Sequence, residues 1–372
     1  MNHPPFTAVP VADPTVSVIM PVHNGAAFLK EAVQSILGQT YADFEFLILD
    51  DGSTDNSAEL VRTFADPRIR LICAPQSGLP VILNRGGTAA RGRYLARMDA
   101  DDVALPERFA LQVAFLDAHP EVAAVGGQAV YLNPDGKIFG PLAKPLLPAE
   151  IRKALLEDAA LIHPASMIRR AAWYAVGGYR PVFIDAEDYD LWVRLSEVAD
   201  LANLPEVILQ YRVHPGQVTV KRACRQQVYR LAVQASARLR QSNGLDCVSD
   251  MKEIGLPELE ILGVPRVESE THLLRYIRSF ALEALEKGDR TKADAALRQL
   301  RTLFARDATP SGNARLAKLG VFLAIRYRRP AAAIAWLVWG GRSFSAVFAT
   351  LGHILGLSSR GGRQQNPARH ER

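Results

Sequence analysis

Short apolar runs alternate with segments of helical periodicity over the first 120 residues, and this alternation limits the fold more than any other feature of the chain. The expected strands are residues 16–20, 44–49, 69–73 and 94–98, and the expected helices are residues 27–37, 56–64, 79–90 and 106–118. Parallel strands need a crossover segment between them, which is usually a helix. The pattern therefore predicts an α/β fold with a mostly parallel open sheet.

The second half of the 372-residue chain has a looser pattern that becomes helical. Residues 122–139 predict a hairpin with a turn at 133–136, strands are expected at 164–168 and 207–213, and a helix is expected at 186–198. Further helices are expected at 221–241, 268–287, 291–306 and 313–328. We therefore expect a flexible leader at 1–14, an α/β domain at 15–220, a helical C-terminal region at 221–357 and a disordered basic tail at 358–372.

The net charge of +5 arises at the C-terminal end, where ten Lys and Arg residues follow residue 310 against one acid, Glu371. This end carries no nucleic-acid-binding motif, so we expect no nucleic-acid partner. Residues 313–357 combine basic side chains with apolar runs and with Trp336 and Trp339. That composition suits an anionic membrane surface, a helical appendage packed on the α/β domain, or a dimer interface. No apolar run reaches the roughly 18 residues of a spanning helix.

Three widely spaced cysteines, Cys73, Cys224 and Cys247, form no CxxC pair. Sparse cysteines of this kind are typical of reduced thiols in a cytosolic protein, not of a disulfide framework or a zinc site. The first residues also lack an apolar core of signal-peptide length. We therefore expect a cytoplasmic protein, or one that lies peripherally on the inner face of the membrane.

Polar residues follow the ends of three expected strands, which is where open α/β sheets bind their ligands. The densest group is Asp99-Ala100-Asp101-Asp102. Three carboxylates in four residues repel one another unless a cation or solvent relieves them, and carboxylate oxygens suit magnesium or manganese. A solvated acidic loop that caps the following helix would have the same pattern, so these residues alone leave both interpretations open.

A second polar group, Asp50-Asp51-Gly52-Ser53-Thr54-Asp55, follows the second expected strand. Asp51 is able to accept a hydrogen bond from a base N–H or a ribose hydroxyl, and Gly52 permits a tight turn and close approach of a ligand. The alternative is a turn and a helix cap, the latter formed by Asp55. Asn24-Gly25 after the first strand is common turn chemistry.

Glu187 and Asp188 lie at the start of the helix expected at 186–198. Asp188 is a candidate general base that takes a proton from an attacking hydroxyl. The alternative is that both carboxylates stabilise the helix N-terminus through the dipole. Single residues are equally ambiguous. Those with both a structural and a functional interpretation are His163, His214, Trp192, Arg85, Arg91 and Arg93.

Taken together and in order, these segments resemble the family 2 glycosyltransferases. The matching motifs are residues 16–24, 35–40, 50–55, 84–86, 90–94, 99–102, 163–164, 177–179, 187–194 and 211–214. Each match is short, but their order over residues 16–214 makes the resemblance specific. It covers a little over half of the chain.

The resemblance implies a GT-A fold and a reaction that usually inverts the anomeric carbon. It assigns the donor to Pro21, His23, Asn24, Asp51, Asn84, Arg85 and Asp99. It assigns a divalent metal, manganese or magnesium, to Asp101, Asp99 and His214. Asp188 becomes the general base, and His163, Glu187 and Trp192 lie on the acceptor side. Asp102 shapes the turn of the acidic loop.

We therefore expect a metal-assisted glycosyltransferase that moves a sugar from a nucleotide-diphosphate donor, a UDP-sugar, to a hydroxyl of a glycan or lipid-linked acceptor. Its pathway would be the synthesis of cell-surface polysaccharide or glycolipid. The chain lacks the Gln-x-x-Arg-Trp motif and the spanning helices of processive members, which predicts the addition of one or few sugars per encounter. Leu83 stands where many relatives have an arginine.

Two alternatives to sugar transfer follow from the same acidic residues. A sugar-phosphate nucleotidyltransferase also uses an α/β sheet and acidic metal ligands, but the glycine-rich phosphate loop that it needs after the first strand is missing. An inactive nucleotide-sugar-binding scaffold is the other alternative, and the intact Asp101 and Asp188 argue against it.

Overall fold

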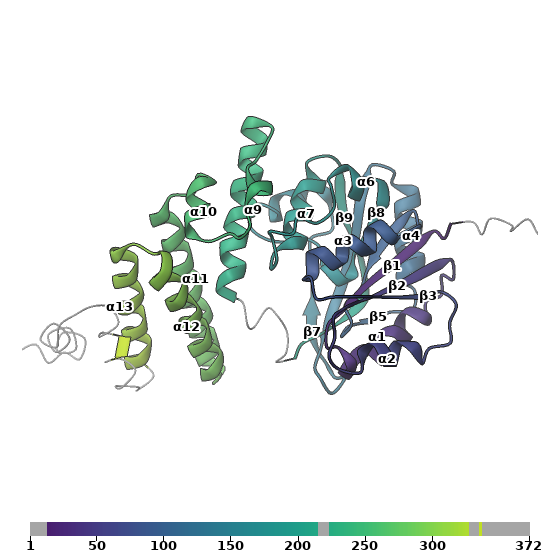
Figure 1. The fold of residues 1–372 in the computed structure, drawn as a ribbon, viewed down its shortest axis with the longest axis horizontal. Coiled ribbons are helices and arrows are strands. Elements are labelled where there is room, and N and C mark those ends of the chain that lie inside the picture. The colour runs from purple at the N-terminus through teal and green to yellow at the C-terminus, as the bar shows by residue number, and fades with distance from the viewer. Residues whose placement is uncertain (1–12, 215–222, 327–334, 337–372) are drawn as a thin grey trace, which may run out of the picture. The chain divides into compact units, whose positions relative to one another are not determined.

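The computed structural model describes residues 13–214, 223–326 and 335–336 (Figure 1). The chain divides into two compact units, Met1–Val264 and Pro265–Arg372. Most of the expected leader at 1–14, the tail at 358–372 and residues 337–357 of the helical region lie outside the described residues. The domain boundary expected near residue 220 remains a prediction, and the first unit extends past it to Val264.

The first unit is built on a nine-stranded sheet with the order β3-β2-β1-β4-β8-β6-β9-β5, and β7 pairs with β6 (Figure 1). The strands are β1 Val16–Val22, β2 Phe44–Asp51, β3 Ile69–Ala74, β4 Tyr94–Arg97, β5 Val103–Ala104, β6 Val122–Leu132, β7 Ile138–Leu142, β8 Met167–Arg169 and β9 Asp200–Arg212. The pairs β1–β2, β1–β4, β2–β3 and β6–β9 are parallel. The expected α/β class with a mostly parallel sheet is confirmed.

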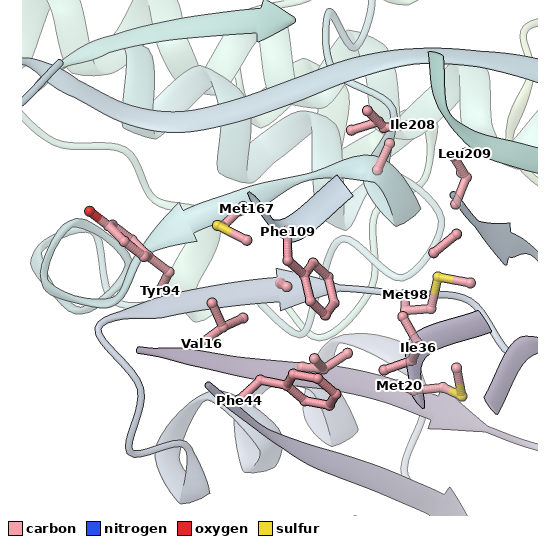
Figure 2. Close-up of a cluster of buried hydrophobic side chains, with 14 of the residues drawn as sticks. Val16, Met20, Ile36, Phe44, Tyr94, Met98, Phe109, Met167, Ile208 and Leu209 are labelled. Atoms are coloured by element: carbon pink, nitrogen blue, oxygen red, sulfur yellow. The ribbon is translucent and has the colours of Figure 1, made fainter. Parts of the chain in front are cut away.

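Helices cover both faces of this sheet. The helices of this unit are α1 Ala26–Leu37, α2 Ser57–Arg62, α3 Leu79–Ala89, α4 Arg108–Ala118, α5 Pro148–Ala154, α6 Arg170–Ala175, α7 Glu187–Ser196, α9 Ala223–Asn243 and α10 Leu256–Ile261. Of these, α9 packs against α7, and α10 packs against α9. Helices α1 and α4 pack on one face, where Ile36 and Phe109 join Met20 and Phe44 in the hydrophobic core (Figure 2). Helix α3 packs on the other face, and a Cβ added at its Gly86 would lie 2.6 Å from a methyl of Leu49.

Some local elements differ from the sequence-based expectations. The strand expected at 164–168 begins instead with a 3-10 turn, His163–Ala165, because the fixed φ and missing N–H of Pro164 suit a turn better than a ladder. The helix expected from Pro106 begins at Arg108. Helices α5 and α10 and the two-residue strand β5 are additions to the expected elements. Elements this short show too little periodicity to be recognised in a sequence.

The second unit contains α11 Arg266–Glu286, α12 Arg290–Asp307 and α13 Pro310–Arg326. Asp289 caps α12 by accepting a hydrogen bond from the Lys292 N–H at 2.9 Å. Glu270 of α11 is fully buried and accepts hydrogen bonds from Thr309 and Arg315, so it joins α11 to the beginning of α13. Within the described parts of the chain, no helix is long and apolar enough to span a bilayer.

Candidate active site

Three carboxylates converge directly after strand β4. Asp99, Asp101 and Asp102 each place an oxygen within 4.8 Å of the others. Burial raises the pKa of Asp101, and the Asp99 charge raises it further. Burial and the charges of Asp99 and Asp101 raise the pKa of Asp102 well above its ordinary value. The cluster is therefore strained by its own charge, and a divalent cation would relieve it because a cation favours the ionised form of nearby carboxylates.

Strand β9 holds the acidic loop in place. The Arg212 N–H donates to Asp102 Oδ1 at 2.8 Å, and Arg212 Nε donates to the Asp101 carbonyl oxygen at 2.7 Å. Asp102 Oδ2 is buried and has no hydrogen-bond partner among the described residues. Two residues further along, His214 Nε2 lies 2.9 Å from Asp101 Oδ2. The chain thus brings His214, the last of the three predicted metal ligands, against the acidic cluster.

The predicted nucleoside-binding residues gather at the ends of β1 and β2. Pro21 is buried in β1 opposite Leu49, beyond the last residue of β1 that pairs with β4, so its missing N–H leaves no gap in that ladder. His23 and Asn24 are exposed at the end of the strand. His23 Nδ1 lies 3.0 Å from the Asp51 carbonyl oxygen. The four residues therefore share one edge of the sheet, as expected for parallel strands.

Asn24 and Asp51 also have local structural roles. Asn24 has a φ of 54°, and its side-chain oxygen accepts the Thr54 N–H at 2.8 Å, which joins the loops after β1 and β2. The Asp51 carboxylate accepts hydrogen bonds from the Ser77 N–H at 2.7 Å, the Ser77 hydroxyl at 2.8 Å and the Gly78 N–H at 2.9 Å. A carboxylate has about four acceptor positions, so Asp51 retains capacity for one further donor.

Asn84 and Arg85, also predicted on the donor side, have different surroundings. Asn84 Nδ2 donates to the Tyr179 carbonyl oxygen at 2.7 Å, and Asn84 Oδ1 accepts the Tyr179 N–H at 2.9 Å. Both polar atoms of this side chain are therefore directed at the backbone of a segment 95 residues away. The side chain of Arg85 is exposed. Of the two residues, Arg85 is the better placed to reach a phosphate.

The predicted base lies at the N-terminus of α7. Burial raises the pKa of Asp188, while the Tyr189 N–H, which donates to Asp188 Oδ1 at 2.7 Å, opposes that rise. The neighbouring Glu187 is buried, and burial together with the Asp188 charge raises its pKa well above the ordinary value. A carboxylate with a raised pKa is a stronger base than an exposed one, which suits proton transfer near neutral pH.

His163 and Trp192 lie beneath this helix start. His163 Nε2 is 2.8 Å from the Tyr179 hydroxyl, and its Nδ1 is 4.0 Å from Glu187 Oε1. Burial and the charge of Arg97 lower the pKa of His163 well below the usual range, so it is neutral. Trp192 is fully buried, with its ring edge-on to His163. The structure therefore places Trp192 in the core beneath the N-terminal turn of α7, and its place on the acceptor side remains a prediction.

Arg97, at the end of β4, joins the two acidic groups of the site. Its side chain is buried and forms an ion pair with Asp99. Burial opposes its charge, but the Asp99 carboxylate outweighs burial and raises the pKa of Arg97. Burial raises the pKa of Glu187 and of Asp188, and the positive charge of Arg97 partly offsets that rise. Arg97 was not predicted from the sequence, where its position two residues before the acidic motif is the signal that could have identified it.

A second buried arginine supports the same strand end. Arg108 of α4 donates to the Arg97 carbonyl oxygen at 2.6 Å and to the Ser166 carbonyl oxygen at 3.2 Å. Burial and the charge of Arg97 lower the pKa of Arg108 to about 9. Arg108 thereby fixes the backbone from which the acidic loop departs. The arrangement joins a multi-carboxylate site to a carboxylate pair through one buried cation.

Comparison with known proteins identifies the family of this chain. A family model described as glycosyl transferase family 2 matches residues 17–177. The putative glycosyltransferase EpsE of Bacillus subtilis (strain 168) is 34% identical over 208 residues, which are 54% of this chain and 73% of that protein. The chain belongs to glycosyl transferase family 2. This membership sets the nucleotidyltransferase alternative aside and makes sugar transfer the activity to propose.

Two further likenesses concern this glycosyltransferase. The hyaluronan synthase of Pasteurella multocida is 29% identical over 211 residues, which are 56% of this chain. The chain spans only about a fifth of the length of that synthase, 21%. The crystal structure of S. aureus TarS 1-349 matches with a TM-score of 0.50 at 16% identity and covers 89% of this chain and 93% of that one. This likeness concerns the fold alone, and the expected GT-A fold is confirmed.

Proposed function

We propose that this glycosyltransferase moves one sugar, or few, per encounter from a nucleoside-diphosphate sugar to a hydroxyl acceptor, with inversion at the anomeric carbon. One observation carries the proposal. The buried Arg97 forms an ion pair with Asp99 in the carboxylate cluster that suits a cation, and its charge also lowers the pKa of Glu187 in the carboxylate pair that suits a base. Transfer by a single displacement needs both, one for the departing diphosphate and one for the attacking hydroxyl.

The acidic cluster fits a divalent metal, manganese or magnesium. Asp99, Asp101 and His214 offer oxygen and imidazole ligands, which suit such ions. The buried Asp102 Oδ2 has no hydrogen-bond partner among the described residues, and a carboxylate oxygen of this kind needs a positive partner. A metal ion bound there would neutralise charge on the departing diphosphate.

The residues of the chain account for the rest of the displacement. The acceptor oxygen forms a bond to the anomeric carbon as the bond from that carbon to the diphosphate breaks. The acceptor proton passes to the Asp188 carboxylate. Because the bond forms on the face opposite the leaving group, the reaction inverts the configuration and needs no covalent enzyme intermediate. Arg97 limits the negative charge that would otherwise disfavour two ionised acids at Glu187 and Asp188.

We propose a UDP-sugar as donor, bound at the edge formed by Pro21, His23, Asn24 and Asp51. The remaining acceptor capacity of Asp51 suits a base N–H or a ribose hydroxyl, and the exposed Arg85 suits a phosphate. Asn84 would support this edge through Tyr179. His163 would act on the acceptor side by positioning Glu187, and Trp192 would support His163 from below.

We also propose a biological setting for the transfer. The hyaluronan synthase among the relatives favours a glycan or lipid-linked acceptor in cell-surface polysaccharide or glycolipid synthesis. The basic, aromatic composition of residues 313–357 favours a peripheral position on the cytoplasmic face of the membrane. In this proposal residues 15–220 form the catalytic domain and residues 221–357 its helical, membrane-associated region.

Donor hydrolysis measured across a panel of nucleotide sugars, with and without manganese, tests the proposal. We expect hydrolysis of one donor, dependence on the cation, and loss of about 100-fold or more in transfer for Asp101→Ala and for Asp188→Asn. Exposed Lys30→Ala is a matched control for surface substitution. Full transfer activity in both acidic variants would overturn the proposed roles.

A further inference from the structure

Helix α9 lies beyond the residues matched by the family model, yet it packs against α7, which carries the proposed base (Figure 1). Three of its arginines form ion pairs with acids of the neighbouring segments. Arg225 pairs with Asp185, Arg230 with Asp158, and Arg240 with Glu197. Gln234, one turn after Arg230, also contacts the Tyr189 hydroxyl of α7 at 3.5 Å.

Two of these acids act directly on the carboxylate pair. Burial is the main cause that raises the pKa of Asp188, and the negative charge of Asp158 adds to it. Burial and Asp188 raise the pKa of Glu187, and the charge of Asp185 adds to that rise. Arg230 and Arg225 therefore neutralise the two acids whose charge disfavours ionisation of the pair. Each arginine acts on a different member of the pair.

The body of α7 is held by the same region. Arg180 donates to both oxygens of Asp190 at 3.1 Å and to Asp246 at 2.9 Å, so it bridges α7 to the segment after α9. Burial acts against the charge of Asp246, but hydrogen bonds from Ser236 and Arg180 lower its pKa to about 2. Asp190 is fully buried and lies two residues after Asp188. The network thus fixes the helix turn that presents the base.

We propose that α9 is a positioning element of the active site, in which Arg225 and Arg230 set the placement and charge of the Glu187–Asp188 pair by binding Asp185 and Asp158. The proposal rests on Asp188 being the base. It extends the set of residues that support catalysis past residue 220, to a helix that pairs with acids beside the proposed base. Arg225 and Arg230 are positioning residues because they act through another side chain.

The Arg230–Asp158 pair gives the sharper test, because its side chains are 30% and 48% exposed and either can be replaced without opening the core. In Arg230→Gln, the uncompensated Asp158 charge disfavours ionised Asp188. We expect kcat at neutral pH to fall by about three- to fivefold, the size of a partly exposed ion pair, with donor KM unchanged. The acidic limb of the pH–kcat profile should move to higher pH.

The charged groups that face Asp188 are Glu187, Asp158, Lys144 and Arg97, with the Tyr179 hydroxyl also near. Of these groups, only Asp158 loses an ion-pair partner in Arg230→Gln. The double variant Asp158→Asn with Arg230→Gln removes both charges, so we expect the pH limb and kcat to return to wild-type values. A double variant as impaired as Arg230→Gln would overturn the proposal, because the arginine would then act through packing.

Arg225→Gln should have a larger effect, about tenfold on kcat, because the Asp185 side chain is fully buried and would lose the compensating charge of Arg225. Arg225→Lys should restore most of the activity. Arg238→Gln, an exposed arginine of the same helix, is the matched control and should be silent. Asp188→Asn, measured alongside, separates the two hypotheses. Activity in Asp188→Asn refutes the base, whereas an inactive Asp188→Asn with unchanged Arg230→Gln refutes only the role of α9.

Discussion

Replacing Asn84 by alanine should destabilise the first unit because it breaks a paired hydrogen bond between distant segments. The Asn84 amide donates to the Tyr179 carbonyl oxygen at 2.7 Å and accepts the Tyr179 N–H at 2.9 Å. Tyr179 is 5% exposed, so water does not replace these partners freely. A buried backbone group left unpaired costs about 1–3 kcal/mol, so two such groups predict a loss of about 2–6 kcal/mol in the free energy of unfolding.

Thermal and urea unfolding of the purified protein measure this loss. For a unit of this size, about 2–4 °C of melting temperature corresponds to each kcal/mol, so we expect a decrease of at least about 4 °C. Asn84→Asp should fall between wild type and Asn84→Ala, because its carboxylate still accepts the Tyr179 N–H but has no donor for the carbonyl oxygen. Arg85→Ala is the matched control, with an exposed side chain and an expected change within about 0.5 kcal/mol.

The same variants distinguish the structural role of Asn84 from a donor-binding role. If Asn84→Ala kept wild-type stability and only weakened donor binding, the reasoning from the Tyr179 contacts would be refuted. If Arg85 contacts phosphate as proposed, Arg85→Ala should raise donor KM without lowering stability.

Three other predictions follow from single sites. Burial disfavours the charge of Glu45, but hydrogen bonds from Ser17, Arg91 and Arg70 outweigh burial and lower its pKa. The contribution of Glu45 to the free energy of unfolding should therefore be complete above the ordinary glutamate pKa of about 4.3 and be lost as the pH falls through the lower folded value. Chemical unfolding measured against pH should show a smaller decrease at acidic pH for Glu45→Gln than for the wild type. Gly92→Ala should lower the free energy of unfolding by more than about 2 kcal/mol, because the added Cβ would stand 2.5 Å from the Ser17 backbone nitrogen. Gly140→Ala is the control and should change the free energy of unfolding by less than about 1 kcal/mol, because the atom nearest to its added Cβ is 3.9 Å away. Equal effects of the two substitutions would contradict this prediction. Manganese should raise the melting temperature of the wild type but not of Asp101→Ala, and removal of metal with EDTA should abolish transfer; a shift retained in Asp101→Ala would place the metal elsewhere.

The sequence-based expectations succeed where the signal is local. The strands at β1, β2, β3 and β4 and the long helices from α11 onward lie within a few residues of their expected ranges. Periodicity and turn residues are properties of neighbouring positions, so they can be recognised without the fold. The short elements α5, α10 and β5 escape recognition because their order depends on packing partners that are distant in the chain.

Site residues show the same division. Asp99, Asp101 and Asp102 are adjacent in the sequence, and their convergence follows from the strand that they terminate. Asn84 illustrates the limit, because its motif points to the donor while its side chain is directed at the backbone of Tyr179. Nothing near Asn84 in the sequence indicates that partner.

By itself, the sequence determined the α/β class, the family and the positions of the acidic motifs, since all of these are encoded in short stretches and in their order. Only the tertiary structure decided that the buried Arg97 pairs with Asp99 and that arginines of α9 pair with Asp185 and Asp158. The physical reason is burial. A charge removed from water must find its partner nearby in space, and in this protein those partners come from elements that are far apart along the chain.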